Sequence, residues 1–212
     1  MKRLLDKYAA KLEAARLTAP GQALLAGLDD RLVFNREAPE AEVLAGVFER
    51  MSINSLLFLP LAEPYATLVD FLAGRSQGSI RPSDCETRTF FHDLPVADEF
   101  TAEALAAALK RRKSVIVPGR GVAAHGTVSP EQAFVSACSV CFACFVKFFA
   151  DYLDLARGQG LDEGYRRAFR EAVRHLPPLR RTPPDLMRGP FATQDEVLRA
   201  MVEAGKATVD YG

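Results

Sequence analysis

Two short apolar runs constrain the fold of this chain more than any other feature. They are residues 54–61 (NSLLFLPL) and residues 114–118 (SVIVP), and each has the length and composition of a buried strand. The neighbouring segments, 65–72 after the first run and 101–110 before the second, carry apolar residues at helical spacing instead. Strands that alternate with helices in this way predict a layered α/β domain.

Helical spacing continues in other parts of the chain. Further helices are predicted over residues 2–17, 40–50, 130–155 and 162–175. Between the helices, the sequence predicts a polar loop over 75–83, a strand at 89–91, and a turn with a short strand over 119–129.

The composition changes at residue 157. Beyond the helix at 162–175 lies the proline-rich stretch LPPLRRTPPDLMRGP, followed by a final predicted helix over 193–205. We therefore predict a domain over residues 1–156 and a helical, proline-containing tail over 157–212. The tail is too short for a second core, so we expect it to pack across the domain or on a neighbouring subunit.

The charge balance gives no general attraction to nucleic acid or membrane. Lysine plus arginine and aspartate plus glutamate both number 27. Residues 157–188 carry eight arginines against four acidic residues, which favours a solvated or intersubunit face over an RNA site. Polar and charged residues interrupt the apolar stretch 133–155, and charges recur near the N-terminus, so we expect no membrane span, no signal peptide and a cytoplasmic protein.

The stretch that follows the second strand has a recognisable order of residues. PGRGVAAHG at 118–126 is followed by SPEQA at 129–133 and then by the long helix. This order resembles the class II aldolase/adducin family, in which His-Gly, a few small residues, Gly and a Glu-Ala pair precede a long helix. The resemblance is strongest over residues 102–154 and extends more loosely back to Val33. It places Arg120 where the family has a zinc histidine.

The resemblance implies a fold and an assembly. The fold is a three-layer αβα domain with a central mixed, mainly antiparallel sheet, followed here by the helical C-terminal extension. The family also implies a homo-oligomer, often a cyclic tetramer with its active site between subunits.

The metal chemistry of the family is not supported by these residues. Class II aldolases use a divalent metal to polarise the substrate carbonyl, with a carboxylate that moves the proton. Here the family's His-x-His zinc pair falls on Pro60 and Ala62, which cannot bind metal, and Arg120 would repel a cation. We therefore predict no metal and no cofactor. The family's phosphate-binding loops are also missing from residues 1–39.

Opposite charges remain at the implied site. The resemblance gives Glu40 the place of the acid/base residue and sets Glu63 beside the lost histidine pair. In one interpretation, Arg120 replaces the metal charge and binds a small anionic ligand together with Glu63, and Glu40 acts as base. In the other interpretation, which we favour, Arg120 and a carboxylate form a buried ion pair that fills a vacated site.

Other residues with reactive side chains each have a structural and a functional interpretation. His92 lies in a loop that borders the family's cleft and could act as acid or base, although a surface histidine is the simpler prediction. Cys138, Cys141 and Cys144 match part of an iron–sulfur spacing, with Cys85 as a distant fourth ligand. They lie in an apolar helix, so we favour buried thiols.

Two functions remain open from the sequence. The first is a non-catalytic binding or oligomeric protein on the aldolase fold. The second is a metal-independent lyase or isomerase that uses Glu40, Arg120 and His92 on a small carbonyl compound, phosphorylated or not. The missing metal ligands and phosphate loops favour the first.

Overall fold

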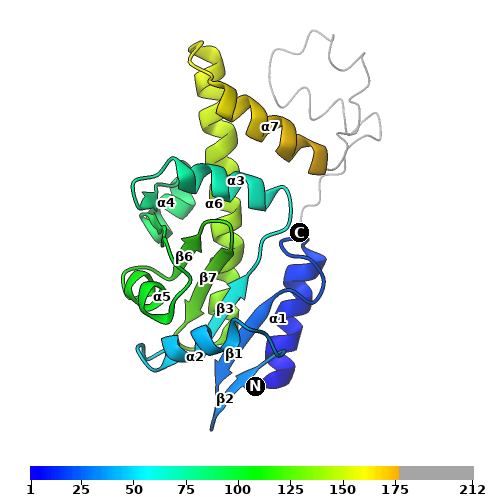
Figure 1. Ribbon diagram of the computed structural model, residues 1–212, viewed down its shortest axis with the longest axis vertical. Helices are drawn as coiled ribbons and strands as arrows, with labels where there is room; N and C mark the ends of the chain where they lie inside the picture. Colours follow the sequence, from blue (N-terminus) through cyan, green and yellow to red (C-terminus); the bar gives the residue numbers. More distant parts are fainter. Residues whose placement is uncertain (177–212) are drawn as a thin grey trace, which may run out of the picture. The chain divides into compact units, whose positions relative to one another are not determined.

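The computed structural model describes residues 1–176, and the helix predicted over 193–205 lies outside them. At its centre is a five-stranded sheet with the order β2-β1-β3-β7-β6 (Figure 1). The strands are β1 (Leu24–Leu28), β2 (Leu32–Phe34), β3 (Ser55–Leu59), β6 (Ser114–Val117) and β7 (Gly121–Gly126). All pairings between these strands are antiparallel, whereas a bridge between Val96 and Ile116 is parallel.

Seven helices and a small second sheet complete the described part of the chain. The helices are α1 (Lys2–Ala14), α2 (Ala41–Phe48), α3 (Tyr65–Gly74), α4 (Cys85–Phe91), α5 (Ala102–Leu109), α6 (Pro130–Arg157) and α7 (Glu163–His175). The second sheet pairs β4 (Ser79–Ile80) with β5 (Leu94–Pro95) in antiparallel fashion.

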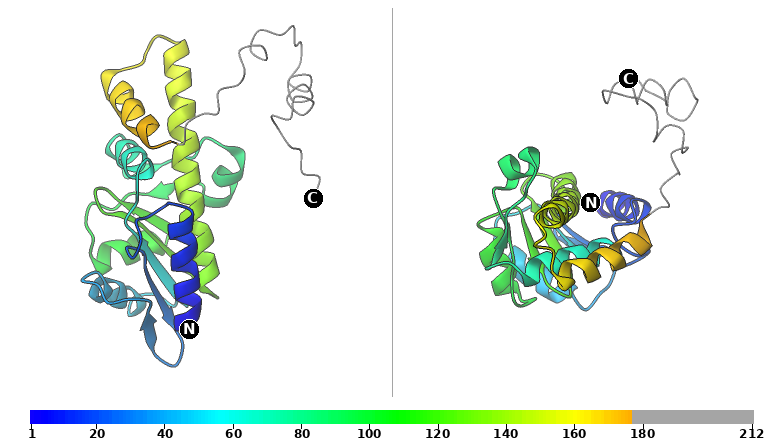
Figure 2. Two further views of the ribbon diagram at one scale, coloured as in Figure 1. Left: turned by 90° about the vertical axis from the view of Figure 1, so that its right-hand side faces the viewer. Right: turned by 90° about the horizontal axis from the view of Figure 1, so that it is seen from above.

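Side chains of β3 alternate between two cores, as expected for a strand covered on both faces. Leu57 and Leu59 pack in the core that contains buried residues of α1 and α6, while Leu56 and Phe58 pack with α2 and α5. The helices therefore form a layer on each side of the sheet (Figures 1 and 2). The predicted three-layer αβα fold with a mainly antiparallel sheet is confirmed.

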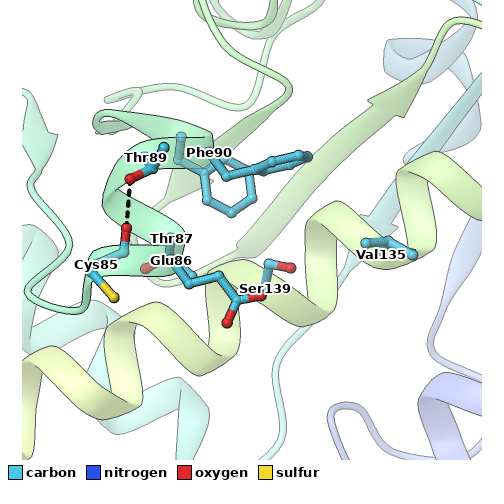
Figure 3. Close-up of a pocket in the computed structure, with 8 residues that line it drawn as sticks. Cys85, Glu86, Thr87, Thr89, Phe90, Val135 and Ser139 are labelled. Carbon is cyan, nitrogen blue, oxygen red and sulfur yellow. Dashed lines mark hydrogen bonds between the residues drawn. The ribbon is translucent and has the colours of Figure 1, made fainter.

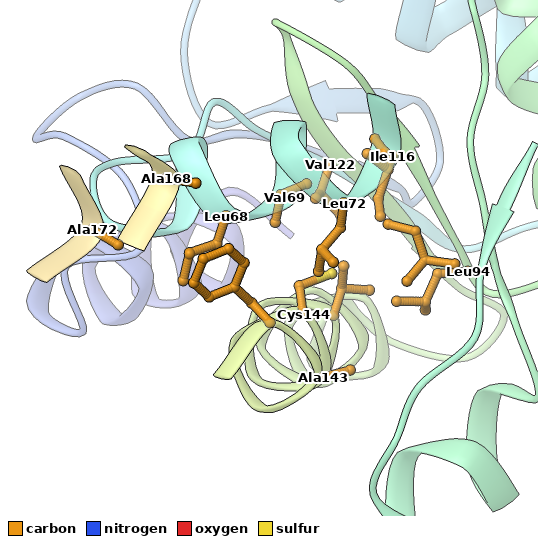
Figure 4. Packing of buried hydrophobic residues seen from close by; sticks show 14 of the residues in the cluster. Leu68, Val69, Leu72, Leu94, Ile116, Val122, Ala143, Cys144, Ala168 and Ala172 are labelled. Carbon is orange, nitrogen blue, oxygen red and sulfur yellow. The ribbon is translucent and has the colours of Figure 1, made fainter. Parts of the chain in front are cut away.

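A third core joins α3, α6 and α7 with Ile116 of β6 and Val122 of β7. Phe148 of α6 is fully buried there, with its ring 5.5 Å from that of Phe71 and 5.6 Å from that of Tyr165. Ala168 and Ala172 of α7 face the same cluster (Figure 4). The compact unit extends to Leu176, so α7, which the sequence analysis assigned to the tail, shares a core with the domain.

The strand predicted at 89–91 is wrong, because these residues form the end of α4. Asp84 caps this helix: its Oδ1 accepts a hydrogen bond of 2.8 Å from the Thr87 amide. Thr89 donates its hydroxyl proton to the Cys85 carbonyl one turn earlier, at 2.7 Å. The residues Thr-Phe-Phe favour a strand, but capping by Asp84 stabilises a helix over these residues instead.

Strands are also present where the sequence analysis predicted none. The loop predicted over 75–83 contains β4, and both β1 and β2 precede the first predicted strand. In β1, Gly27 interrupts the apolar pattern, which weakens the strand signal. A Cβ at Gly27 would lie 2.5 Å from the sulfur of Met1, so the missing side chain makes room for the N-terminal residue.

Helix α6 is long and apolar enough to cross a membrane by length and composition alone. It packs instead along β7 and β3, and Ala133, Ala137, Val140 and Phe148 are among its buried residues. Burial of one face against the sheet explains the apolar composition, so α6 is a core helix of this domain.

Candidate functional site

The end of β3 and the hairpin between β6 and β7 meet at one end of the sheet. In the β3–β7 ladder, Leu59 is opposite Val122. A Cβ on Gly121 would lie only 2.1 Å from the Leu59 carbonyl oxygen and 3.0 Å from Cα of Pro60. The hairpin that carries Arg120 is therefore in direct contact with the segment that begins at Pro60.

The loop after α1 holds this segment in place. Thr18 Oγ1 donates a hydrogen bond of 2.6 Å to the Pro60 carbonyl, and the Ala62 amide donates one of 2.9 Å to the Leu17 carbonyl. The three positions that the resemblance assigned to zinc ligands, which are Pro60, Ala62 and Arg120, thus belong to segments that converge at this end of the sheet.

Arg120 and Glu40 are brought together at the same place. Arg120 Nη2 lies 3.4 Å from Glu40 Oε1, and its guanidinium lies 4.9 Å from the centroid of the Phe100 ring. Phe100 in turn stacks against Phe58 of β3, with 4.5 Å between the ring centroids. The Arg120 side chain is 50% exposed and that of Glu40 is 23% exposed. The pair is therefore a partly solvated contact at the surface, whereas the sequence interpretation expected a buried ion pair.

Glu63 and His92 have other surroundings. Glu63 Oε2 accepts a hydrogen bond of 3.2 Å from the Thr67 amide in the first turn of α3, and within residues 1–176 it forms no ion pair with Arg120. His92 ends α4 and is exposed. It lines a cavity that neither Glu40 nor Arg120 lines. The structure therefore brings together Glu40 and Arg120, but neither Glu63 nor His92 joins them.

Four cavities in the described part of the chain lie away from the Glu40–Arg120 pair. They have volumes of about 520, 450, 480 and 410 Å³, and neither Glu40 nor Arg120 lines any of the four. The first lies between α4 and α6, where Cys85, Phe90, Val135 and Ser139 contribute to its wall (Figure 3). Phe90 is 58% exposed, so this cavity opens on an apolar surface.

Comparison with known proteins gives matches to solved structures only. No protein-family model and no curated protein matches the chain. Among solved structures, the L-fuculose-1-phosphate aldolase from Thermus thermophilus aligns with a TM-score of 0.58 at 17% identity, over 70% of this chain and 93% of the aldolase. This chain has the class II aldolase fold.

Two further structures with this fold are similar to the chain. The sugar-phosphate aldolase from Thermotoga maritima aligns with a TM-score of 0.54 at 12% identity, over 77% of this chain and 97% of that enzyme. The L-fuculose 1-phosphate aldolase from Glaciozyma antarctica aligns with a TM-score of 0.51 at 16% identity, over 80% of both chains. At these identities the similarity shows a shared class II aldolase fold, and it does not show a shared reaction.

The residues at the end of the sheet where the segments of Pro60, Ala62 and Arg120 converge, here called the convergence point, are not suited to bind zinc. Zinc takes imidazole, thiolate or carboxylate ligands. Pro60 and Ala62 offer no side-chain donor, and Arg120 keeps its proton and its positive charge. Within the described residues, no group of three histidine, cysteine, aspartate or glutamate side chains is placed to hold a metal ion.

The cysteines of α6 behave as small apolar side chains. Cys141 and Cys144 are fully buried in two of the cores, and Cys138 is half-buried. Burial raises the pKa of Cys138 to about 11 and that of Cys144 to about 12. These thiols therefore stay protonated at neutral pH, which fits the interpretation as buried thiols.

His125 is a buried polar residue to which the sequence analysis gave no role. It lies on β7 with 7% of its surface exposed, and its Nδ1 has no hydrogen-bond partner within the described residues. Burial lowers the pKa of His125; a hydrogen bond with the Leu109 backbone opposes this shift, and the charge of Lys113 adds to it. His125 is therefore a neutral side chain beneath α5. The sequence feature that could have identified His125 as a buried polar residue is its position in an otherwise apolar strand.

Proposed function

We propose that this protein is a non-catalytic binding protein with a class II aldolase fold that has lost the zinc site. The observation that carries the proposal is the contact of Arg120 with Glu40 at the convergence point. A permanent cation there disfavours a second cation, and Pro60 and Ala62 supply no ligand.

The Glu40 carboxylate is also poorly placed to act as a base. A general base must reach the proton that it removes, and Glu40 already faces the guanidinium of Arg120 at 3.4 Å. Phe100 holds that guanidinium from a second side, at 4.9 Å. The pair satisfies its own charges, which supports a structural role for both side chains.

Restoring the histidines tests the loss of the zinc site. We expect the triple variant P60H/A62H/R120H to bind about one zinc ion per chain, measured by elemental analysis after dialysis, and the unchanged protein to bind none. The double variant P60H/A62H is the control, because it keeps Arg120 and should bind zinc much more weakly. Stoichiometric zinc in the unchanged protein would contradict the proposal.

A metal-independent lyase or isomerase is the second candidate, and the half-exposed guanidinium of Arg120 favours it. Solvent reaches this group, so a small anionic carbonyl compound could approach it. The test is cleavage of sugar 1-phosphates, including L-fuculose 1-phosphate, in the presence of EDTA. We expect no turnover. EDTA-resistant turnover that is lost in both E40Q and R120Q would establish the enzyme instead.

We also propose that the protein is a homo-oligomer, with a tetramer as the form that the family resemblance implies. Exposed apolar side chains on the outer face of α6 and on α4 support this proposal, because contiguous apolar surface commonly marks an interface. Phe142 is 52% exposed and Val135 is 45% exposed. Light scattering coupled to gel filtration should give the mass of four chains, and a monomer at micromolar concentration would contradict the proposal.

A further inference from the structure

A cavity of about 480 Å³ lies beside the end of α4 and the small sheet, and neither Glu40 nor Arg120 lines it. The residues that line it are mostly cationic or polar: Ser79, Arg81, Arg88, His92, Asp93 and Arg112. They come from β4, α4, the α4–β5 turn and the segment after α5. Segments that are distant in sequence thus place three guanidinium groups and an imidazole around one space.

Among the described residues, Asp93 is the only carboxylate that lines this cavity, and it is already paired. Its side chain is 15% exposed. Arg112 Nε donates a hydrogen bond of 2.5 Å to Asp93 Oδ1, and Arg112 Nη2 forms an ion pair with the same oxygen at 2.5 Å. Arg111 approaches the other oxygen at 3.9 Å. Asp93 therefore fixes the position of Arg112 and has little capacity left to neutralise further cations.

Arg81 and Arg88 have no such partner. Both are exposed, and within residues 1–176 neither forms an ion pair or a side-chain hydrogen bond. Three arginines against one aspartate leave an excess of two positive charges among these four side chains. Guanidinium groups recognise carboxylate and phosphate through paired N–H donors, so a dianionic group is the natural complement of this surface.

The backbone at His92 is held in an uncommon conformation. His92 has φ 62° and ψ −57°, and the Asp93 amide donates a hydrogen bond of 2.7 Å to the Phe91 carbonyl. This is the three-residue γ-turn of the rare, strained form. Strained backbone of this kind is concentrated at ligand sites, where it directs a side chain. Here the turn places His92 and Asp93 in the wall of the same cavity.

We propose that this cavity binds the phosphate group of a small phosphorylated molecule through Arg81, Arg88 and Arg112, with His92 at its edge. A neighbouring cavity of about 450 Å³ shares Ser79 and Arg81 as lining residues and adds Leu72 and Ile80. That second space can take the organic part of the ligand. The proposal does not depend on whether Glu40 and Arg120 are catalytic.

The experiment is isothermal titration calorimetry on the full chain at constant ionic strength, with chloride as the balancing anion. The probes are inorganic phosphate, glycerol 1-phosphate and malonate. We expect both phosphate compounds to bind, and the double variant R81Q/R88Q to weaken that binding at least about tenfold. Tighter binding of glycerol 1-phosphate than of inorganic phosphate would show that the organic part contributes, and equal binding would show that the phosphate group is sufficient.

A matched control removes the same charge elsewhere. Arg166 and Arg167 are exposed on α7, so R166Q/R167Q changes net charge equally without touching the cavity. R166Q/R167Q should bind phosphate as tightly as the unchanged protein does. Both R166Q/R167Q and R81Q/R88Q should have the melting temperature of the unchanged protein. Equal weakening in the two variants, tighter binding of malonate than of phosphate, or no binding of either phosphate compound would each overturn the proposal.

Discussion

Arg120 makes its contacts with groups from three segments of the chain. Its amide donates to the Val117 carbonyl across the β6–β7 turn, its guanidinium faces Glu40 at the start of α2, and the ring of Phe100 lies beneath it. An arginine with these contacts stays in place without a ligand. These contacts pair opposite charges at this end of the sheet.

The Glu40–Arg120 contact should contribute little to stability. We expect a coupling free energy of at most about 1 kcal/mol from a double-mutant cycle of E40Q and R120Q, because the guanidinium is half exposed and screened by water. Urea unfolding of the four proteins measures it. The Lys147–Asp151 pair of α6, at 3.0 Å and less exposed, is the control cycle. A coupling of several kcal/mol would show that the pair is effectively buried.

His125 should make the protein less stable in mild acid. Burial lowers the folded-state pKa of His125 below its ordinary value of 6.5, so the unfolded chain binds this proton more readily. Stability contributed by the neutral side chain is therefore present above about pH 6.5 and is lost as the pH falls toward the folded-state pKa. Urea unfolding should show this loss as the pH falls below about 6.5, with a slope of at most about 1.4 kcal/mol per pH unit.

The variant H125Q identifies the source of that dependence. It removes the titrating group and should flatten the pH profile, whereas H175Q, on the exposed last turn of α7, should leave it unchanged. A profile that is equally steep in H125Q would assign the effect to other groups.

At the scale of elements, the β6–β7 hairpin depends on glycine at its closest approach to β3. Gly121 has φ 133°, a conformation that L side chains rarely adopt. The Gly119 amide also donates a hydrogen bond of 2.9 Å to Asp70 Oδ1 of α3. The hairpin is thus fixed to β3 on one side and to α3 on the other, which sets the position of Arg120 between them.

Substitution of Gly121 should distort this element. We expect G121A to lower the free energy of unfolding by at least about 1–3 kcal/mol, because an added Cβ would overlap the Leu59 carbonyl and the backbone would be strained. Chemical denaturation provides the measurement. At Gly74, by contrast, an added Cβ meets nothing within 4 Å, so G74A should be neutral or stabilising by up to about 1 kcal/mol. Equal effects of the two substitutions would contradict this account.

At the scale of the whole described unit, three cores pack against the same sheet, and two of them also contain residues of the long helix. Helix α6 contributes buried residues to two of them, through Cys141 on one and Phe148 on the other. Helix α7 covers the second of these with Tyr165, Ala168 and Ala172. The stability of the α3–α6–α7 region therefore depends on α7 as well as on the sheet.

Truncation should separate the role of α7 from that of the residues beyond it. The reference is a chain that ends at Leu176, which keeps all three cores. A chain that ends at Arg157 should lose at least about 3 kcal/mol, because it exposes the aromatic cluster around Phe148. Thermal and urea unfolding compare the two. Similar stability of both fragments would show that α7 contributes little to the stability of the domain.

Local patterns in the sequence predicted most elements correctly. The runs at 54–61 and 114–118 contain β3 and β6, and helical spacing identified α1, α3, α5 and α6. These signals work because the side chains of one strand or one helix meet a core at a fixed period, which the sequence preserves. The strand wrongly predicted at 89–91 shows the limit, since the capping carboxylate of Asp84, which precedes it, outweighed β-favouring side chains.

The sequence by itself determined the layered class of the fold and, through its resemblance, the segments that carry Glu40 and Arg120. Only the tertiary structure decided what those segments do together. It placed the two charges 3.4 Å apart, left Glu63 and His92 elsewhere, and gathered Arg81, Arg88 and Arg112 around another cavity. The physical reason is that periodicity reports which face of an element is buried, whereas the meeting of distant charges depends on how the buried faces stack.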